Sequence, residues 1–257
     1  RTFFKWRLLQ CGAMEAQPAD TPETGAPERY ERAVRSYVLR AGRVTEGQKR
    51  ALQDLWPIWG IEPESGLLDF HRLFGNDRPV VLEIGFGNGE ATWRMAQASP
   101  EENFLAVEVH KPGVGRLLLK IEEHGLVNVR IACEDAVELL RHRVPDNSLA
   151  GVRIYFPDPW PKKRHHKRRI VQAPFIELLA GKLAPGGILH LATDWAPYAE
   201  HMLEVMQGSE GFENLSPDGA YCEKPGWRPP TKYERRGRRL GHEVADLVFR
   251  RRADGQD

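Results

Sequence analysis

A buried strand that runs into three closely spaced glycines constrains this chain more than any other feature. Residues 80–90 read VVLEIGFGNGE, so an apolar run contains Glu83 and glycines follow at positions 85, 87 and 89. Such a run is typical of a parallel strand buried on both faces. The glycines let the backbone turn sharply and approach a ligand closely before a helix begins. The segment therefore predicts a nucleotide-shaped binding site.

The glycine spacing separates two kinds of ligand. Gly85-x-Gly87-x-Gly89 differs from the G-x-G-x-x-G of dinucleotide-binding proteins. Glu83 lies just before the turn, where a carboxylate favours a ligand with a cationic sulfonium and an amino group over a pyrophosphate. We therefore expect S-adenosylmethionine to bind here, in contact with Glu83, Gly85 and Gly87. A glycine turn with only a structural role remains the alternative for this segment alone.

The pattern after residue 79 predicts the fold. The chain has 257 residues, 41% hydrophobic and 28% charged, which suits one globular domain with extensions. Strand and helix patterns alternate, as in right-handed βαβ units. We expect an α/β, Rossmann-like fold with a seven-stranded, mostly parallel sheet flanked by helices. The predicted strands are 80–85, 104–109, 129–133, 151–156, 187–193, 212–215 and 242–250.

Acidic side chains mark the ends of four successive predicted strands. They are Glu83, Glu108, Asp135 and Asp158. Because ligands of such sheets bind outside the carboxyl ends of the strands, we expect these acids to share one cavity. Glu108 is placed to accept hydrogen bonds from two ribose hydroxyls, and Asp135 from an adenine amino group. A helix cap explains any one of these acids, but it explains four in succession poorly.

Positive charge is concentrated in two segments of a nearly neutral chain, whose formal net charge is +1. Residues 153–169 hold seven Lys and Arg against one acid, and residues 228–252 hold nine against three, which gives +6 for each. This unevenness predicts a polyanionic partner. Solvated arginine faces are the alternative.

The segment after the fourth strand is the most distinctive. Residues 155–169 read YFPDPWPKKRHHKRR. Prolines on both sides of Asp158 restrict the backbone and hold its carboxylate in one direction. Trp160 offers a flat face, and the cations after it can bind phosphates. His165 and His166 are adjacent and cannot share one helical face, so we expect an RNA-facing surface and no metal site.

Several separate motifs make the chain resemble the bacterial tRNA (guanine-N7-)-methyltransferases, from about Arg35 to the C-terminus. The motifs read RSYV from residue 35, GRVT from 42, LEIGFGNGE from 82, FPDPWPKKRH from 156, ATDW from 192 and RPPTKYERRG from 228. The proline-bracketed acid and the TKYE motif are far more diagnostic than the glycines. Tyr233 is a departure, because Phe is common there, but the aromatic ring is retained.

The resemblance implies a class I S-adenosylmethionine-dependent enzyme that forms N7-methylguanine in the variable loop of tRNA. It implies cofactor contacts from Glu83, Glu108, Asp135 and Asp158, and RNA lying over residues 164–169. The implied substrate contacts are Lys162, Asp194, Thr231, Lys232, Tyr233 and Glu234, and the implied RNA contacts are Arg164, His165, His166, Lys167, Arg168 and Arg169.

The expected chemistry is mostly alignment. Guanine N7 carries a lone pair and no proton, so no base is needed to activate it, and the methyl group must lie in line between sulfur and N7. The product base is cationic, so a carboxylate near the ring stabilises the growing charge. Asp158 is the predicted catalytic residue, with Asp194 and Glu234 as further candidates. A flipped guanine would stack on Trp160, Trp195 or Tyr233, or these rings are buried packing.

The segments before residue 79 differ from the rest. Residues 15–28 are rich in Pro, Ala, Glu and Thr, so we expect a disordered tail over residues 1–28. We expect residues 1–13 to lie upstream of the natural start, because Met14 opens an ordinary polar tail. Residues 29–78 are a predicted basic arm, which leaves residues 79–257 for the methyltransferase domain.

Other classes of protein explain less. Cys11, Cys133 and Cys222 form no CxxC pair, which fits a reducing, cytoplasmic environment, and no apolar run approaches the roughly 18 residues of a membrane span. A nicotinamide-dependent oxidoreductase would leave the Pro-Asp-Pro turn unexplained. A non-catalytic RNA-binding protein would leave the aligned acids unexplained. The sequence does not decide between a monomer and a homodimer.

Overall fold

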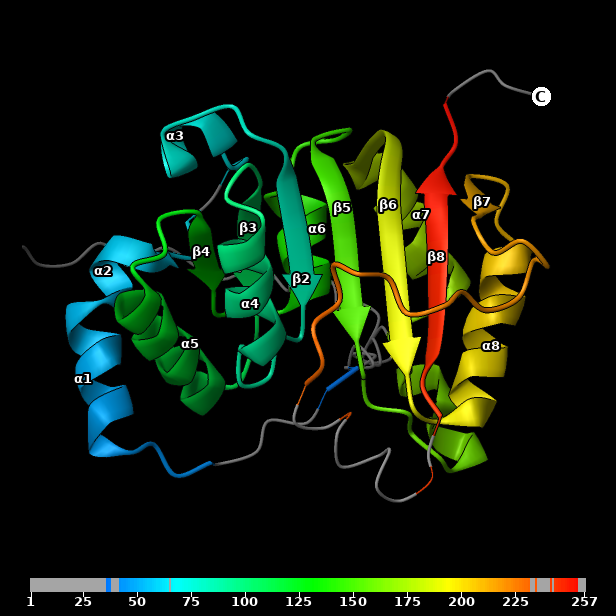
Figure 1. Cartoon of the computed structure of the whole chain (residues 1–257), viewed down its shortest axis with the longest axis horizontal. Helices are drawn as coiled ribbons and strands as arrows, with labels where there is room; N and C mark the ends of the chain where they lie inside the picture. Colours follow the sequence, from blue (N-terminus) through cyan, green and yellow to red (C-terminus); the bar gives the residue numbers. More distant parts are fainter. Residues whose placement is uncertain are drawn as a thin grey trace, which may run out of the picture. The chain divides into compact units, whose positions relative to one another are not determined.

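A mostly parallel sheet forms the frame of the computed structural model, which describes residues 36–37, 42–64, 66–231, 234, 241 and 243–253 (Figure 1). All of these residues belong to one compact unit. Within them the sheet has eight strands in the order β1-β4-β3-β2-β5-β6-β8-β7, and β8 pairs in antiparallel fashion with both of its neighbours, β6 and β7. The strands are β1 (Gly60–Ile61), β2 (Val80–Ile84), β3 (Asn103–Val107), β4 (Val129–Ala132), β5 (Leu149–Tyr155), β6 (Leu183–Thr193), β7 (Phe212–Asn214) and β8 (Ala245–Arg251).

All seven predicted strands are present, with ends that differ by a few residues. The α/β, Rossmann-like fold with a mostly parallel sheet is therefore confirmed. The eighth strand, β1, was not predicted, because its two residues are too few to show an alternating pattern. It pairs in parallel with β4 at the edge of the sheet.

Helices cover the sheet on two faces, and each face has its own apolar cluster. On one face α5 presents the stripe Val114, Leu117, Leu118 and Ile121, all 0% exposed. Burial of such a stripe is what stabilises an amphipathic helix on a sheet. This face carries α1 (Glu46–Asp54), α4 (Glu90–Ala98) and α5 (Lys111–His124), and the other carries α3 (Phe70–Phe74), α6 (Ala136–His142), α7 (Ala173–Lys182) and α8 (Ala196–Gln207).

The described part of the predicted arm packs on the same core as the strands. Helix α1 begins with a capping box between Thr45 and Gln48, and the Gln48 side chain also donates to the carbonyl of Pro112 at the start of α5 at 3.0 Å. Trp56 and Trp59, in α2 (Trp56–Trp59), pack against the cluster on the α5 face. Residues 42–64 are thus part of the packed domain. The predicted tail over residues 1–28 lies outside the described residues.

The structure adds three observations on the other protein classes. Within the described ranges, no helix combines the length and the apolar character that crossing a bilayer requires. The same part of the chain holds no group of His, Cys, Asp and Glu side chains suited to a metal ion. Cys133 and Cys222 are free thiols.

Candidate active site

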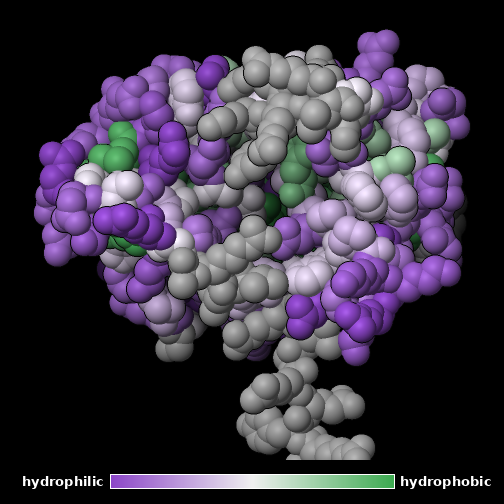
Figure 2. Space-filling model, turned by 90° about the horizontal axis from the view of Figure 1, so that it is seen from below, coloured by the Kyte–Doolittle hydropathy of each residue, from purple (hydrophilic) through white to green (hydrophobic). Residues whose placement is uncertain are grey.

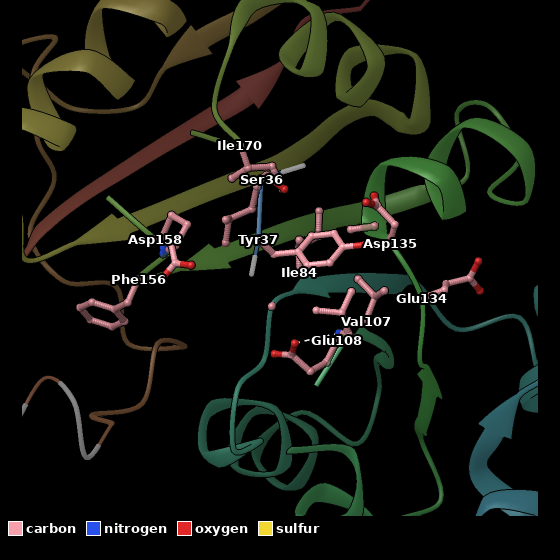
Figure 3. A pocket seen from close by; sticks show the side chains of 15 residues that line it. Ser36, Tyr37, Ile84, Val107, Glu108, Glu134, Asp135, Phe156, Asp158 and Ile170 are labelled. Atoms are coloured by element: carbon pink, nitrogen blue, oxygen red, sulfur yellow. Dashed lines mark hydrogen bonds between the residues drawn. The ribbon is translucent and has the colours of Figure 1, made fainter. Parts of the chain in front are cut away.

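A cavity of about 210 Å³ lies at the carboxyl ends of four neighbouring strands, β4, β3, β2 and β5. Seen from this edge, polar side chains surround a small apolar hollow (Figure 2). The cavity brings together Glu108, Asp135 and Asp158, with Tyr37 between Asp158 and Asp135 (Figure 3). The apolar lining includes Ile84, Val107, Ala136, Ile154 and Ile170. Apolar walls with a few convergent polar groups are typical of a small-molecule site.

The glycine turn after β2 forms one wall. Gly85 lines the cavity with φ of 71°, and Gly87 has φ of 59°, a left-handed conformation that glycine adopts without strain. The turn lies close to α5, since a Cβ on Gly113 would be 2.0 Å from the carbonyl oxygen of Gly87. Gly85 therefore places bare backbone at the wall of the cavity, whereas Gly87 is absent from the described residues that line it.

Glu108 is fixed at the end of β3 by three backbone donors. One oxygen accepts from the N–H of Gly87 at 2.9 Å, and the other accepts from Val109 and His110 at 2.8 and 3.1 Å. Oε2 accepts only the bond from Gly87 and keeps a second lone pair, so Glu108 can still accept from a ligand hydroxyl. Its direction is set before any ligand arrives.

Asp135 has two roles. It is the N-cap of α6, where Oδ1 accepts from Val137 N at 2.8 Å and Glu138 N at 3.4 Å, and its side chain also lines the cavity. Asp135 is thus a helix cap, as the alternative reading expected. This does not exclude a ligand contact, since Oδ2 can still accept a hydrogen bond from a ligand. The neighbouring Glu134 instead forms an ion pair with Arg143.

The turn that carries Asp158 is strained and braced. The flanking Phe156 and Trp160 have φ of 54° and 45°, and such conformations of bulky residues cost about 1–3 kcal/mol each. Three hydrogen bonds hold the turn: Phe156 N to Ala192 O at 2.7 Å, Trp160 Nε1 to Ser36 O at 3.1 Å, and Arg169 Nε to Pro159 O at 2.9 Å. Asp158 itself is exposed at the cavity.

Arg169 braces this turn from the inside. It is 4% exposed, and its guanidinium lies 4.8 Å from the centre of the Tyr198 ring. Burial raises the pKa of Tyr198 to about 12, so the ring beneath the cation is a neutral phenol. The charge of Arg169 is thus directed into the protein, and its predicted contact with RNA stays a prediction.

The rest of the basic segment faces solvent to different degrees. Arg168 stacks on the Trp160 ring at 4.8 Å, so one side of that ring is already covered. Trp195 is 36% exposed and remains open for stacking. His165, His166 and Arg168 are half-buried, and the fully exposed cations are Lys162, Lys163, Arg164 and Lys167, at the start of and along the 3₁₀ helix η1 (Lys163–Arg168).

Glu83 is absent from the described residues that line the cavity. It is 2% exposed, and its carboxylate accepts a hydrogen bond from Thr92 Oγ1 of α4 at 2.6 Å. Burial raises the pKa of Glu83 to about 7. The expectation that four acids share one cavity holds for three of them, because alternation along β2 turns Glu83 toward α4 while Ile84 lines the cavity. Its contact with the cofactor stays a prediction.

The predicted substrate residues differ in how far they are exposed to solvent. Lys162 is exposed, and Asp194 is half-buried after β6. Thr231 and Glu234 are 7% and 1% exposed, and the carboxylate of Glu234 is paired with Arg228. Lys232 and Tyr233 lie outside the described residues. The sequence reasoning missed Ser36 and Tyr37 as cavity residues, although their motif RSYV was part of the resemblance.

A glycine turn after β2 and acids after β3, β4 and β5 around one cavity define a class I S-adenosylmethionine-dependent methyltransferase. The solved 16S rRNA methyltransferase KamB shares the fold, with a TM-score of 0.53 and 17% identity over 73% of this chain and 95% of that chain. A family model described as "Putative methyltransferase" matches residues 77–247.

Curated relatives refine the class. The tRNA (guanine-N(7)-)-methyltransferase of Alcanivorax borkumensis is 56% identical over 90% of this chain and 96% of its own length. The enzyme of the same name from Aeromonas hydrophila is 54% identical over 87% of this chain and 94% of its own length. The chain belongs to the tRNA (guanine-N(7)-)-methyltransferase family, which confirms the resemblance that the motifs carried.

Proposed function

We propose that this chain transfers the methyl group of S-adenosylmethionine to N7 of a guanine in tRNA. The observation that carries the proposal is the exposed carboxylate of Asp158, held on a braced turn beside a cavity that Glu108 and Asp135 also line. The family relationship supports the same reaction. Because its substrate is tRNA, we also propose a cytoplasmic location.

The donor set of the cavity fits S-adenosylmethionine. Glu108 would hold the ribose hydroxyls and Asp135 the adenine amino group, on the apolar surface of Ala136 and Val107. The cofactor supplies an electrophilic methyl on a cationic sulfonium, and carboxylates around the cavity favour that charge. Gly85 leaves room for close approach along the wall.

Asp158 would act on the transition state by charge and position. Positive charge develops on the guanine as N7 gains the methyl group, and a carboxylate fixed beside the ring stabilises it. Since the turn is already strained and hydrogen-bonded, Asp158 needs little reorganisation during the reaction. No proton must be removed from N7, so Asp158 is not needed as a general base.

The exposed cations around η1 would bind the tRNA backbone. Lys162, Lys163, Arg164 and Lys167 follow the Asp158 turn directly, so phosphates bound there lie beside the site of reaction. N7 is on the major-groove edge, which protein side chains cannot reach in a closed A-form helix. We therefore propose a loop guanine, in the variable loop, as the target.

The test is transfer of labelled methyl from S-adenosylmethionine to unmodified tRNA, followed by chain cleavage at N7-methylguanine to map the position. We expect one labelled guanine in the variable loop. Label at another guanine would correct the position, and the absence of transfer would refute the proposed reaction. Calorimetry with S-adenosylmethionine and with a nicotinamide dinucleotide separates the proposal from the oxidoreductase alternative.

A further inference from the structure

A loop, and not a helix, covers part of one sheet face. The segment between β7 and β8 crosses in front of β6 and β5 (Figure 1, orange). Beneath it lie the buried polar side chains of Tyr155, His190 and Asp246, from β5, β6 and β8. Buried polar groups of this kind need hydrogen-bond partners.

Arg228, on the crossing segment, supplies two hydrogen bonds to Asp246. Its side chain is 0% exposed. Nε and Nη2 donate to the two oxygens of Asp246 at 2.6 and 2.8 Å, and Nη1 donates to Oε2 of Glu234 at 2.7 Å. We call Arg228, Asp246 and Glu234 the arginine latch. A forked guanidinium bound to two carboxylates fixes orientation as well as distance.

His190 completes the latch as a neutral side chain. Its Nδ1 accepts from the indole N–H of Trp227 at 3.1 Å, and an indole can only donate. The ring proton is therefore on Nε2, which donates to Asp246 at 2.7 Å. Burial lowers the pKa of His190, in agreement with this state. Burial would raise the pKa of Asp246, but the hydrogen bonds from His190 and Arg228 outweigh it and lower that pKa.

A second cation lies beside the latch. Lys224 Nζ lies 3.6 Å from Oε1 of Glu234, so among the described residues both carboxylates of the latch face cations. Removing one charge would leave the others uncompensated in a buried place, which is unfavourable. The latch therefore holds the crossing segment in one arrangement.

Arg228 also connects the two sides of the proposed reaction. Its guanidinium carbon lies 5.7 Å from the centre of the Phe156 ring, and Phe156 is the cavity residue that begins the Asp158 turn. Figure 3 shows this ring pointing away from the centre of the cavity. On the other side, the backbone N–H of Glu234 donates to Thr231 Oγ1 at 3.2 Å, within the predicted substrate segment.

We propose that Arg228 is a positioning residue, which fixes Thr231 and Glu234 relative to the Asp158 turn and so aligns the guanine for methyl transfer. The inference rests on the proposed function. Arg228 is absent from the described residues that line the cavity. Binding of S-adenosylmethionine is therefore expected to be independent of the latch, while turnover depends on it.

The experiment compares Arg228→Lys and Arg228→Met with the matched control Tyr155→Phe. Lys retains the positive charge but cannot bind two carboxylates as the planar guanidinium does, and Met retains only the apolar part of the side chain. The control removes a buried hydrogen bond of the same network, from Tyr155 Oη to His190 Nδ1 at 3.1 Å, without touching Arg228. Methyl transfer to tRNA gives kcat and KM, and calorimetry gives the Kd of S-adenosylmethionine.

We expect kcat to fall about tenfold or more in Arg228→Lys and further in Arg228→Met, because the guanine would no longer be aligned with the methyl group. The Kd of S-adenosylmethionine should stay within about twofold, and Tyr155→Phe should keep kcat within about threefold. Equal kcat in Arg228→Lys and the control would overturn the inference, as would a Kd that rises as much as kcat falls.

Two further outcomes are covered by the design. If circular dichroism shows that Arg228→Lys is unfolded at the assay temperature, Asp246→Asn, which keeps the shape of the side chain, is judged by the same criteria. If the wild-type chain binds S-adenosylmethionine but transfers no methyl to tRNA, the proposed function fails and the inference with it. An active wild type with an equally active Arg228→Lys removes the inference alone.

Discussion

Removing the charge of Arg169 and removing the charge of Lys167, two residues apart, are predicted to have different effects. The first should lower stability and kcat, and the second should change only the salt dependence of tRNA binding. Arg169→Met deletes the hydrogen bond to the Pro159 carbonyl and the contact with the Tyr198 ring. Leaving the partly buried carbonyl of Pro159 unpaired costs about 1–3 kcal/mol, and the lost cation–π contact adds about 1 kcal/mol. The free energy of unfolding should therefore fall by about 2–4 kcal/mol.

The effect on Tm and on turnover follows from that loss. A domain of this size loses about 2–4 °C in Tm for each kcal/mol, so we expect a decrease of about 5–15 °C. Because the lost hydrogen bond braces the Asp158 turn, kcat should also fall, by about 100-fold if the carboxylate moves by about 1 Å. Thermal unfolding by calorimetry and methyl-transfer kinetics at a temperature well below the Tm measure the two effects separately.

Lys167→Met is the matched control. Lys167 is exposed, so the substitution should change the free energy of unfolding by no more than about 0.5 kcal/mol. If Lys167 contacts a phosphate, the slope of log affinity for tRNA against log salt should become shallower by about 0.7–0.9. The reasoning about Arg169 is refuted if Arg169→Met retains normal stability and kcat and instead shows the shallower salt slope.

Three further predictions concern other positions. Asp158→Asn should keep the fold and the Kd of S-adenosylmethionine while kcat falls by about 10²–10³, and near wild-type turnover would remove Asp158 from its role. Gly113→Ala should weaken S-adenosylmethionine binding by tenfold or more, about 1.4 kcal/mol, because its Cβ would lie 2.0 Å from the Gly87 carbonyl; unchanged calorimetric affinity would contradict this. Burial raises the pKa of Glu83 from 4.5 to about 7. Between these two pH values the folded state keeps a proton that the unfolded state releases. The free energy of unfolding should therefore fall as pH rises from about 4.5 to about 7 and level off above it. Glu83→Gln should remove this decline, of order 3 kcal/mol, and equal pH slopes in urea unfolding of the two proteins would count against it.

Local patterns were sufficient to predict most of the sheet. The apolar runs and the helix stripe of α5 depend on spacing along the chain, and each residue of that stripe is fully buried. The acids at the strand ends were also predictable, because parallel topology brings strand ends together. The same reasoning placed Glu83 wrongly in the cavity, since a strand buried on both faces gives no pattern that tells one face from the other.

The count of basic residues overstated the charged surface. Sequence alone treats every arginine alike, whereas four arginines of the two basic segments are directed inward and serve as hydrogen-bond donors to carbonyls or carboxylates. Whether an arginine is buried depends on partners distant in sequence, and no local pattern reveals them. Among the described residues of the two segments, the buried arginines are Arg153, Arg169, Arg228 and Arg251.

The double role of Asp135 limits how this enzyme can change. Its Oδ1 caps α6 while the same residue lines the cavity proposed to hold the nucleoside. A mutation that altered the preference for the base by removing this side chain would also weaken the helix by about 1 kcal/mol. Asn and Ser cap a helix about as well as Asp while removing the charge, so an evolutionary path toward a different nucleoside at this position passes through one of these two replacements.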